Sequence, residues 1–82
     1  MNAVNGPFES SRDAARFSDW EMFGREAGKT ISESNMIQLL GELSGVELGA
    51  WDEKVLEWLA GYEPSTVTAV CGLLGRVREQ AP

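Results

Sequence analysis

The sequence predicts an all-α fold, a small bundle or orthogonal array of about four helices that follows a flexible N-terminal arm. Apolar residues recur at helical spacing in several segments, and glycines and prolines separate those segments. No segment alternates apolar and polar residues long enough to predict a strand. The connections are short, which favours helices packed against one another. We therefore expect residues 1–8 to form the arm and residues 9–82 to form a single helical domain.

The first helix is expected to begin near Ser10 or Ser11, either of which can cap it, and to run to about Ala27. Gly28 is a natural helix stop. One apolar stripe at 3-4-3 spacing consists of Phe17, Trp20, Gly24 and Ala27.

The second helix is expected to be capped by Ser32 or Ser34 and to end at Gly45. Residues 30–33 also resemble the lead-in of a capping box. The apolar face of this helix consists of Met36, Ile37, Leu39, Leu40 and Leu43.

Two further helices are expected in the second half of the chain. Asp52 caps the third helix, and Gly61 ends it. Pro64 opens the fourth in the first-turn position that proline tolerates. The apolar face of the third helix consists of Trp51, Val55, Trp58, Leu59 and Tyr62. The stripe of the fourth helix consists of Val67, Val70, Cys71, Leu74 and Val77.

The net charge of −6 comes from the middle of the chain, because residues 31–64 carry seven acidic side chains and only Lys54 as a base. Such a surface repels nucleic-acid phosphates and favours basic partners. The simpler interpretation is that it only keeps a small protein soluble. No segment reaches the ~20 apolar residues of a membrane span, and residues 1–9 lack the pattern of a signal peptide. We therefore expect a cytoplasmic protein that does not contact a membrane.

The composition argues against catalytic and metal chemistry. The chain has no histidine and a single cysteine, Cys71, within an apolar run, where it is expected to pack in the core. A cysteine or serine nucleophile normally needs an adjacent base, and zinc or iron–sulfur sites need several Cys or His ligands. We therefore expect no enzyme activity, no metal and no cofactor.

The aromatic residues of the third helix are the first candidates for a binding site. Aromatic residues at helical spacing usually form core, and we expect most of this cluster to be buried. Trp58, beside Glu57 and near the turn, is the residue expected to stay exposed as an anchor for a partner. Tyr62 would join it in that contact. On the fourth helix, one side is left bare by Ala69, Gly72 and Gly75. It permits close approach of another helix, either within the fold or from a second subunit, and we expect it to form part of the contact.

These features predict a non-enzymatic module for protein–protein interaction or self-association. Six acidic side chains would bias the contact of this module towards basic surfaces. The six are Glu42, Glu47, Asp52, Glu53, Glu57 and Glu63. One alternative is an acidic decoy that inhibits a nucleic-acid-binding protein. The other is a small helix-turn-helix regulator formed by the last two helices. In such a regulator, Ser65, Thr66 and Thr68 would face the bases of DNA. Arg76 and Arg78 would lie near its phosphates. The acidic preceding helix argues against direct nucleic-acid binding.

Two segments of the C-terminal half carry a resemblance. They are Val46-Glu47-Leu48-Gly49-Ala50-Trp51-Asp52 and Trp58-Leu59-Ala60-Gly61-Tyr62-Glu63-Pro64-Ser65-Thr66-Val67. In these segments the chain resembles the short uncharacterised proteins of high-GC actinobacteria and their phages. The resemblance implies a cytoplasmic accessory protein of a phage or other mobile element, and it brings no known activity to these positions.

Overall fold

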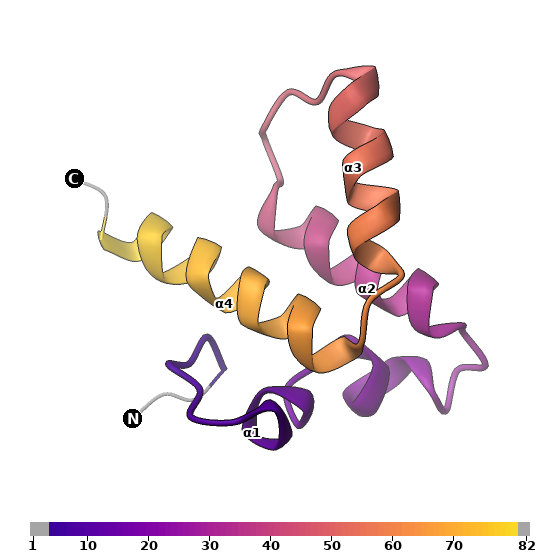
Figure 1. The fold of residues 1–82 in the computed structure, drawn as a ribbon, viewed down its shortest axis with the longest axis vertical. Coiled ribbons are helices and arrows are strands. Elements are labelled where there is room, and N and C mark those ends of the chain that lie inside the picture. The colour runs from indigo at the N-terminus through magenta and orange to yellow at the C-terminus, as the bar shows by residue number, and fades with distance from the viewer. Residues whose placement is uncertain (1–3, 81–82) are drawn as a thin grey trace.

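The computed structural model of the chain describes residues 4–80, and its regular elements within that range are all helical (Figure 1). This confirms the predicted all-α class. The order is α1 (Ser11–Ala15), the π-helix η1 (Trp20–Gly24), α2 (Ile31–Glu42), α3 (Ala50–Ala60) and α4 (Pro64–Gln80). Within these residues, no helix combines the length and the apolar character needed to cross a bilayer.

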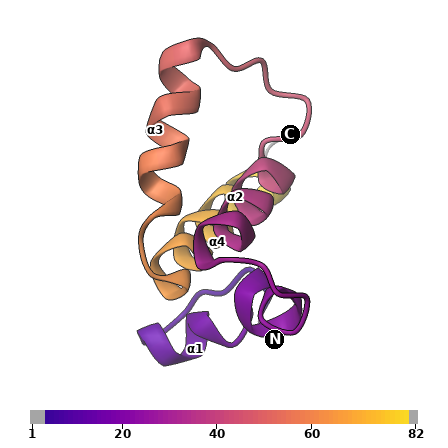
Figure 2. The same cartoon turned by 90° about the vertical axis from the view of Figure 1, so that its right-hand side faces the viewer.

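The long helix α4 organises the molecule, because α1 packs on one side of it and α2 on another. Figure 2 shows α1 beneath the crossing of α2 and α4, and α3 standing apart at the edge of the molecule. α3 packs mainly against α2. The core between these helices is small and consists of Leu39, Ala60, Val67 and Cys71, with Met36, Leu56, Leu59 and Val70 packed against it.

The single helix predicted from Ser10 or Ser11 to Ala27 is wrong, because the chain breaks between α1 and η1. Ser18 is fully buried at this break; its hydroxyl donates to Ala15 O at 2.8 Å and accepts from Glu21 N at 3.1 Å. A serine that bonds the local backbone in this way competes with the helical ladder. Ser10 does cap α1 as expected, accepting from the backbone N–H of Asp13.

α2 begins at Ile31 and is capped by Thr30 rather than by Ser32 or Ser34. The Thr30 hydroxyl accepts from Glu33 N at 3.0 Å, and the Glu33 carboxylate accepts from Thr30 N at 2.7 Å. This is the reciprocal capping box, in which two free donors of the first turn are satisfied. Gly45 follows the helix with a φ of +85°, a backbone conformation that glycine adopts without steric cost.

α3 begins at Ala50, so Asp52 lies inside its first turn and is not the cap residue. The Asp52 carboxylate reaches back to accept from Gly49 N at 2.8 Å. Gly61 ends the helix and Pro64 opens α4, both as predicted. The turn between them is held to α2 by Asn35, a fully buried side chain whose amide donates to Ala60 O at 2.8 Å and to Tyr62 O at 2.7 Å.

The segment expected as a flexible arm lies against α4 over its described residues, 4–8. Arg76 donates to Asn5 O at 2.7 Å, and the ring of Phe8 stacks on Phe17 with 6.2 Å between centroids. The Asn5 amide also reaches Glu79 at 3.4 Å. Residues 1–3 of the predicted arm lie outside the described range.

Candidate functional site

α3 carries an apolar stripe that faces solvent. We call this set the α3 stripe; Trp51, Val55 and Trp58 lie on the helix, and Tyr62 follows its last turn. All four are exposed; Trp51 exposes 73% of its surface and Trp58 63%. The stripe repeats at helical spacing, so it runs along one side of α3. Trp58 and Tyr62 meet edge to face with 4.9 Å between ring centroids, which holds part of the stripe in a fixed arrangement.

The surface beside the stripe is also apolar, because α2 and the α2–α3 connection expose Leu40 and Val46. Leu40 and Leu48 line one groove beside the stripe, and Val46 lines another together with Trp51 and Val55. The exposed apolar surface therefore extends from α3 onto α2 and the connection between them.

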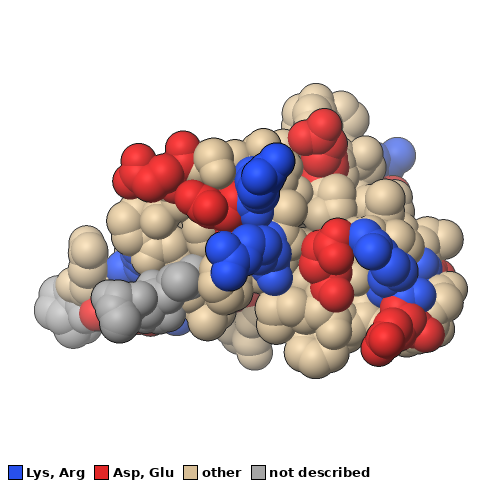
Figure 3. Space-filling view, turned by 90° about the horizontal axis from the view of Figure 1, so that it is seen from below, with Lys and Arg blue, Asp and Glu red and all other residues tan. Residues whose placement is uncertain are grey.

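Acidic side chains surround this apolar surface. Glu47, Asp52, Glu53 and Glu57 are all exposed, and Lys54 is the only base on α3. The opposite end of the molecule differs. Figure 3 looks from below at the face that carries α1 and shows Lys and Arg side chains interspersed with Asp and Glu. The charge asymmetry of the sequence is therefore retained in the fold, with the acidic surplus around α3.

The structure brings only some of the predicted contact residues together. Trp58 lies on α3 with Glu53 and Glu57, and Tyr62 lies in the turn that follows the helix. The remaining members lie elsewhere: Ala69 and Glu63 line a different groove, between α1 and the start of α4, and Gly72 and Gly75 are buried.

The expected bare side of α4 is covered by the chain itself, which corrects the prediction that Gly72 and Gly75 face a partner. A Cβ at Gly72 would lie 2.7 Å from the backbone oxygen of Asn5, and one at Gly75 would lie 2.8 Å from the Asn5 amide nitrogen. The small residues do permit a close approach, but the approaching segment is the chain's own non-helical N-terminal one and not another helix.

The expectation that most of the aromatic cluster is buried is wrong. Trp58 is exposed as expected, but Trp51, which was not expected to be exposed, is more exposed still. Residue spacing places both tryptophans on one side of α3, and it does not tell whether another element covers that side. The beginning of α3 lies beyond the reach of α4, so its side chains have little to pack against.

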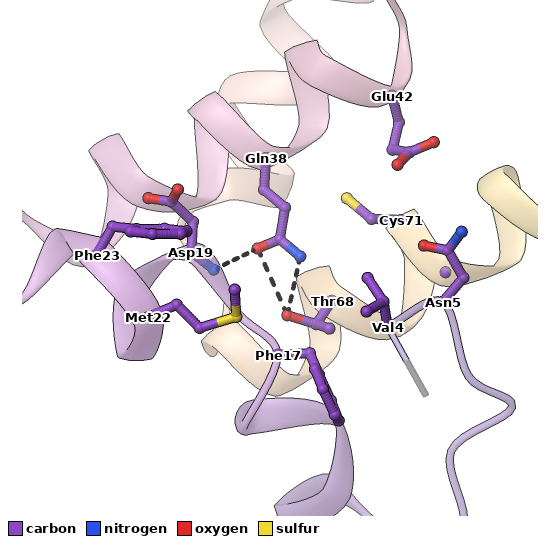
Figure 4. A pocket seen from close by; sticks show the side chains of 11 residues that line it. Val4, Asn5, Phe17, Asp19, Met22, Phe23, Gln38, Glu42, Thr68 and Cys71 are labelled. Atoms are coloured by element: carbon purple, nitrogen blue, oxygen red, sulfur yellow. Dashed lines mark hydrogen bonds between the residues drawn. The ribbon is translucent and has the colours of Figure 1, made fainter. Parts of the chain in front are cut away.

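A second candidate site is the cavity of about 190 Å³ beside Cys71 (Figure 4). Inside it, the Gln38 amide donates to Thr68 Oγ1 at 3.2 Å, and Gln38 Oε1 accepts from Asp19 N at 3.1 Å. Burial, aided by the charge of Glu42, raises the pKa of the Cys71 thiol to about 12. Among the described residues that line the cavity, none is a His, Lys or Arg whose positive charge would favour the thiolate.

The cavity is also smaller than the ~300–1,000 Å³ of typical ligand pockets. Three of its polar groups, the Asp19 backbone N–H, the Gln38 amide and the Thr68 hydroxyl, bond to one another and join the start of η1 to α2 and α4. Within residues 4–80, no group of three or more His, Cys, Asp or Glu side chains is arranged to hold a metal ion. The surface of α3 is therefore the stronger candidate site.

Comparison with known proteins identifies no relative of this chain. No protein-family model matches the chain. No curated protein matches it. No solved structure matches it either. The resemblance to short actinobacterial and phage proteins thus stays a prediction, and any function has to be argued from the geometry of the molecule.

Proposed function

We propose that the protein is a non-enzymatic helical interaction module that binds a protein partner through the α3 stripe and the apolar surface beside it. The observation that carries this proposal is the exposure of Trp51 and Trp58 on a helix that protrudes from the fold. Tryptophan and tyrosine are enriched among the residues that contribute most to binding. Solvent exposure of two indole rings on one stripe is costly unless a partner covers them.

The size of the core supports the same proposal. Within residues 4–80, the buried apolar residues are Ala14, Leu39, Ala60, Val67 and Cys71. A chain of this length buries a modest share of its surface and has marginal stability alone. A partner that binds only the folded state adds to its stability by mass action. Binding through α3 would therefore supply apolar burial that the isolated fold lacks.

The helix-turn-helix alternative requires Thr68 to face the bases of DNA. Thr68 is buried and bonds to Gln38, and Arg76 and Arg78 donate to the backbone carbonyls of Asn5 and Glu42. These side chains already have partners inside the molecule. The acidic-decoy alternative uses the same side of the protein as our proposal, and it differs in requiring binding that is lost at high salt.

The proposed setting is a cytoplasmic accessory protein of a phage or other mobile element. This part of the proposal is supported only by the resemblance of residues 46–52 and 58–67 and by the free thiol of Cys71, which suits a reducing compartment.

Affinity capture from the source cell tests the proposal with three baits: the wild-type chain, a Trp51→Ala/Trp58→Ala variant and a Phe23→Ala control. Phe23 is exposed to a similar extent, 61%, but lies on η1. We expect a specific protein that resists high salt to be retained by the wild type and by the control and lost from the double variant. Equal retention by all three would refute the assignment of the site. Loss of the partner at high salt would favour the decoy. Circular dichroism checks that each bait is folded.

A further inference from the structure

The hairpin of α2 and α3 holds two apolar grooves, one on each side of a shared ridge. The ridge is formed by Leu48 and Leu56, which line both grooves. The first groove, of about 400 Å³, runs from the end of α2 along the start of α3 and includes Trp51 and Val55. The second, of about 250 Å³, lies against Leu40. The residues that line both grooves come from α2, α3 and the connection between them, and α3 stands apart at the edge of the molecule (Figure 2).

Each groove has an acidic rim. The first is flanked by Glu47 and Asp52, and the second by Glu53 and Glu57. Among the described residues, no Lys or Arg side chain lines either groove, and this includes Lys54 of α3. An apolar floor between carboxylates is complementary to a ligand that is apolar along one stripe and basic along its flanks.

A helix is the peptide form that best fits this pattern. α3 is 11 residues long and so extends for about 16 Å, enough to contact about three turns of a second helix. Apolar side chains spaced three and four residues apart would enter the grooves on both sides of the ridge. Basic residues next to that stripe would then lie opposite the four rim carboxylates. A second copy of α3 would bring the same carboxylates to this position, so like charges would oppose its docking.

We propose that the two acid-rimmed grooves dock a basic amphipathic helix of another protein. This inference rests on the proposed function and adds the chemistry of the partner. It predicts that affinity depends jointly on the helical apolar stripe of the ligand and on the carboxylates of this chain.

Three synthetic peptides of about 18 residues, each about five helical turns long, provide the probes. The first has leucines on one helical stripe and lysines elsewhere, the second replaces the lysines by glutamates, and the third scrambles the first so that the stripe is lost. Binding to the full chain is measured by the emission shift of the exposed tryptophans and by calorimetry. We expect the first peptide to bind at least tenfold more tightly than either of the others.

Matched variants then separate local charge from net charge. Glu53→Gln/Glu57→Gln removes two rim carboxylates, and Glu9→Gln/Glu26→Gln removes two exposed carboxylates elsewhere, so both variants have the same net charge. We expect the rim variant to bind the lysine peptide about fivefold more weakly, equivalent to roughly 1 kcal/mol, and the control to change by less than about twofold. Trp51→Ala, in the first groove, should weaken binding by about tenfold.

The outcomes distinguish this inference from the function on which it rests. If the glutamate peptide binds as tightly as the lysine peptide and Trp51→Ala weakens both, the interaction surface stands and the basic partner is refuted. If rim and control variants lose equal affinity, the binding is general charge attraction and the groove assignment is refuted. A chain that dimerises in sedimentation, and stops doing so in Trp51→Ala, identifies a second copy as the occupant and refutes the basic helix. If no peptide binds and the tryptophan variants retain every captured protein, the proposed function fails as well.

Discussion

Asn35 ties the end of α3 to α2, and replacing it tests how the interaction surface is supported. Its amide makes two short hydrogen bonds, to Ala60 O at 2.8 Å and Tyr62 O at 2.7 Å, from a fully buried position. Each such bond contributes about 1 kcal/mol net, and a buried carbonyl left without a donor costs more. The better helix propensity of alanine returns roughly 0.5 kcal/mol. We expect Asn35→Ala to lower the free energy of unfolding by about 2 kcal/mol.

Urea unfolding followed by far-UV circular dichroism measures this loss, with Ser32→Ala as the control. Ser32 is an exposed residue of the same helix, so its replacement should change the free energy of unfolding by less than about 0.5 kcal/mol. The slope of the unfolding line should be the same for both variants, which shows that the comparison concerns stability alone. An Asn35→Ala variant as stable as Ser32→Ala would refute the reasoning that these two bonds hold α3 in place.

Three further predictions concern the rest of the fold. Gly72→Ala should lower the free energy of unfolding by about 1–3 kcal/mol in thermal unfolding, because its Cβ would lie 2.7 Å from Asn5 O. Gly41→Ala, where a Cβ meets no atom within 4 Å, should instead raise it by about 1 kcal/mol; equal effects would contradict this account of the N-terminal segment. Thr30→Ala should remove about 1 kcal/mol in urea unfolding, and an unchanged midpoint would show that the capping box contributes nothing. Burial raises the pKa of Cys71 from 9.0 to about 12, so the folded chain keeps a proton that the unfolded chain releases. Stability should therefore fall as pH rises from about 9 to 12, and a thiol reagent that labels the native protein rapidly at pH 8 would disprove this.

Much of the helical architecture could be predicted from local signals. The helical spacing of apolar residues, together with Gly61 and Pro64, located α3 and α4 closely. The break after α1 could not be predicted in this way, because it depends on Ser18 being buried and on Asp19 N bonding to Gln38, a residue 19 positions away. Such long-range partners leave no trace in the spacing of one segment.

The candidate site could be predicted only in part, because its exposure also depends on contacts between distant segments. Spacing placed Trp51 and Trp58 on one side of a helix, but exposure depends on which elements reach that side. Likewise, Gly72 and Gly75 indicated a close approach without indicating that Asn5 would make it. Residue patterns thus gave the faces of the helices, and the path of the whole chain decided what covers each face.

The central claim, that a partner binds on α3, is tested most directly by hydrogen exchange on the complex purified from the source cell. The amides of α3 and of residues 46–49 should exchange more slowly in the complex than in the free chain. The amides of α1, at the opposite end of the molecule, should exchange at the same rate in both. If protection appears at α1 and the start of α4 while α3 is unchanged, the partner uses the other groove and the account is contradicted.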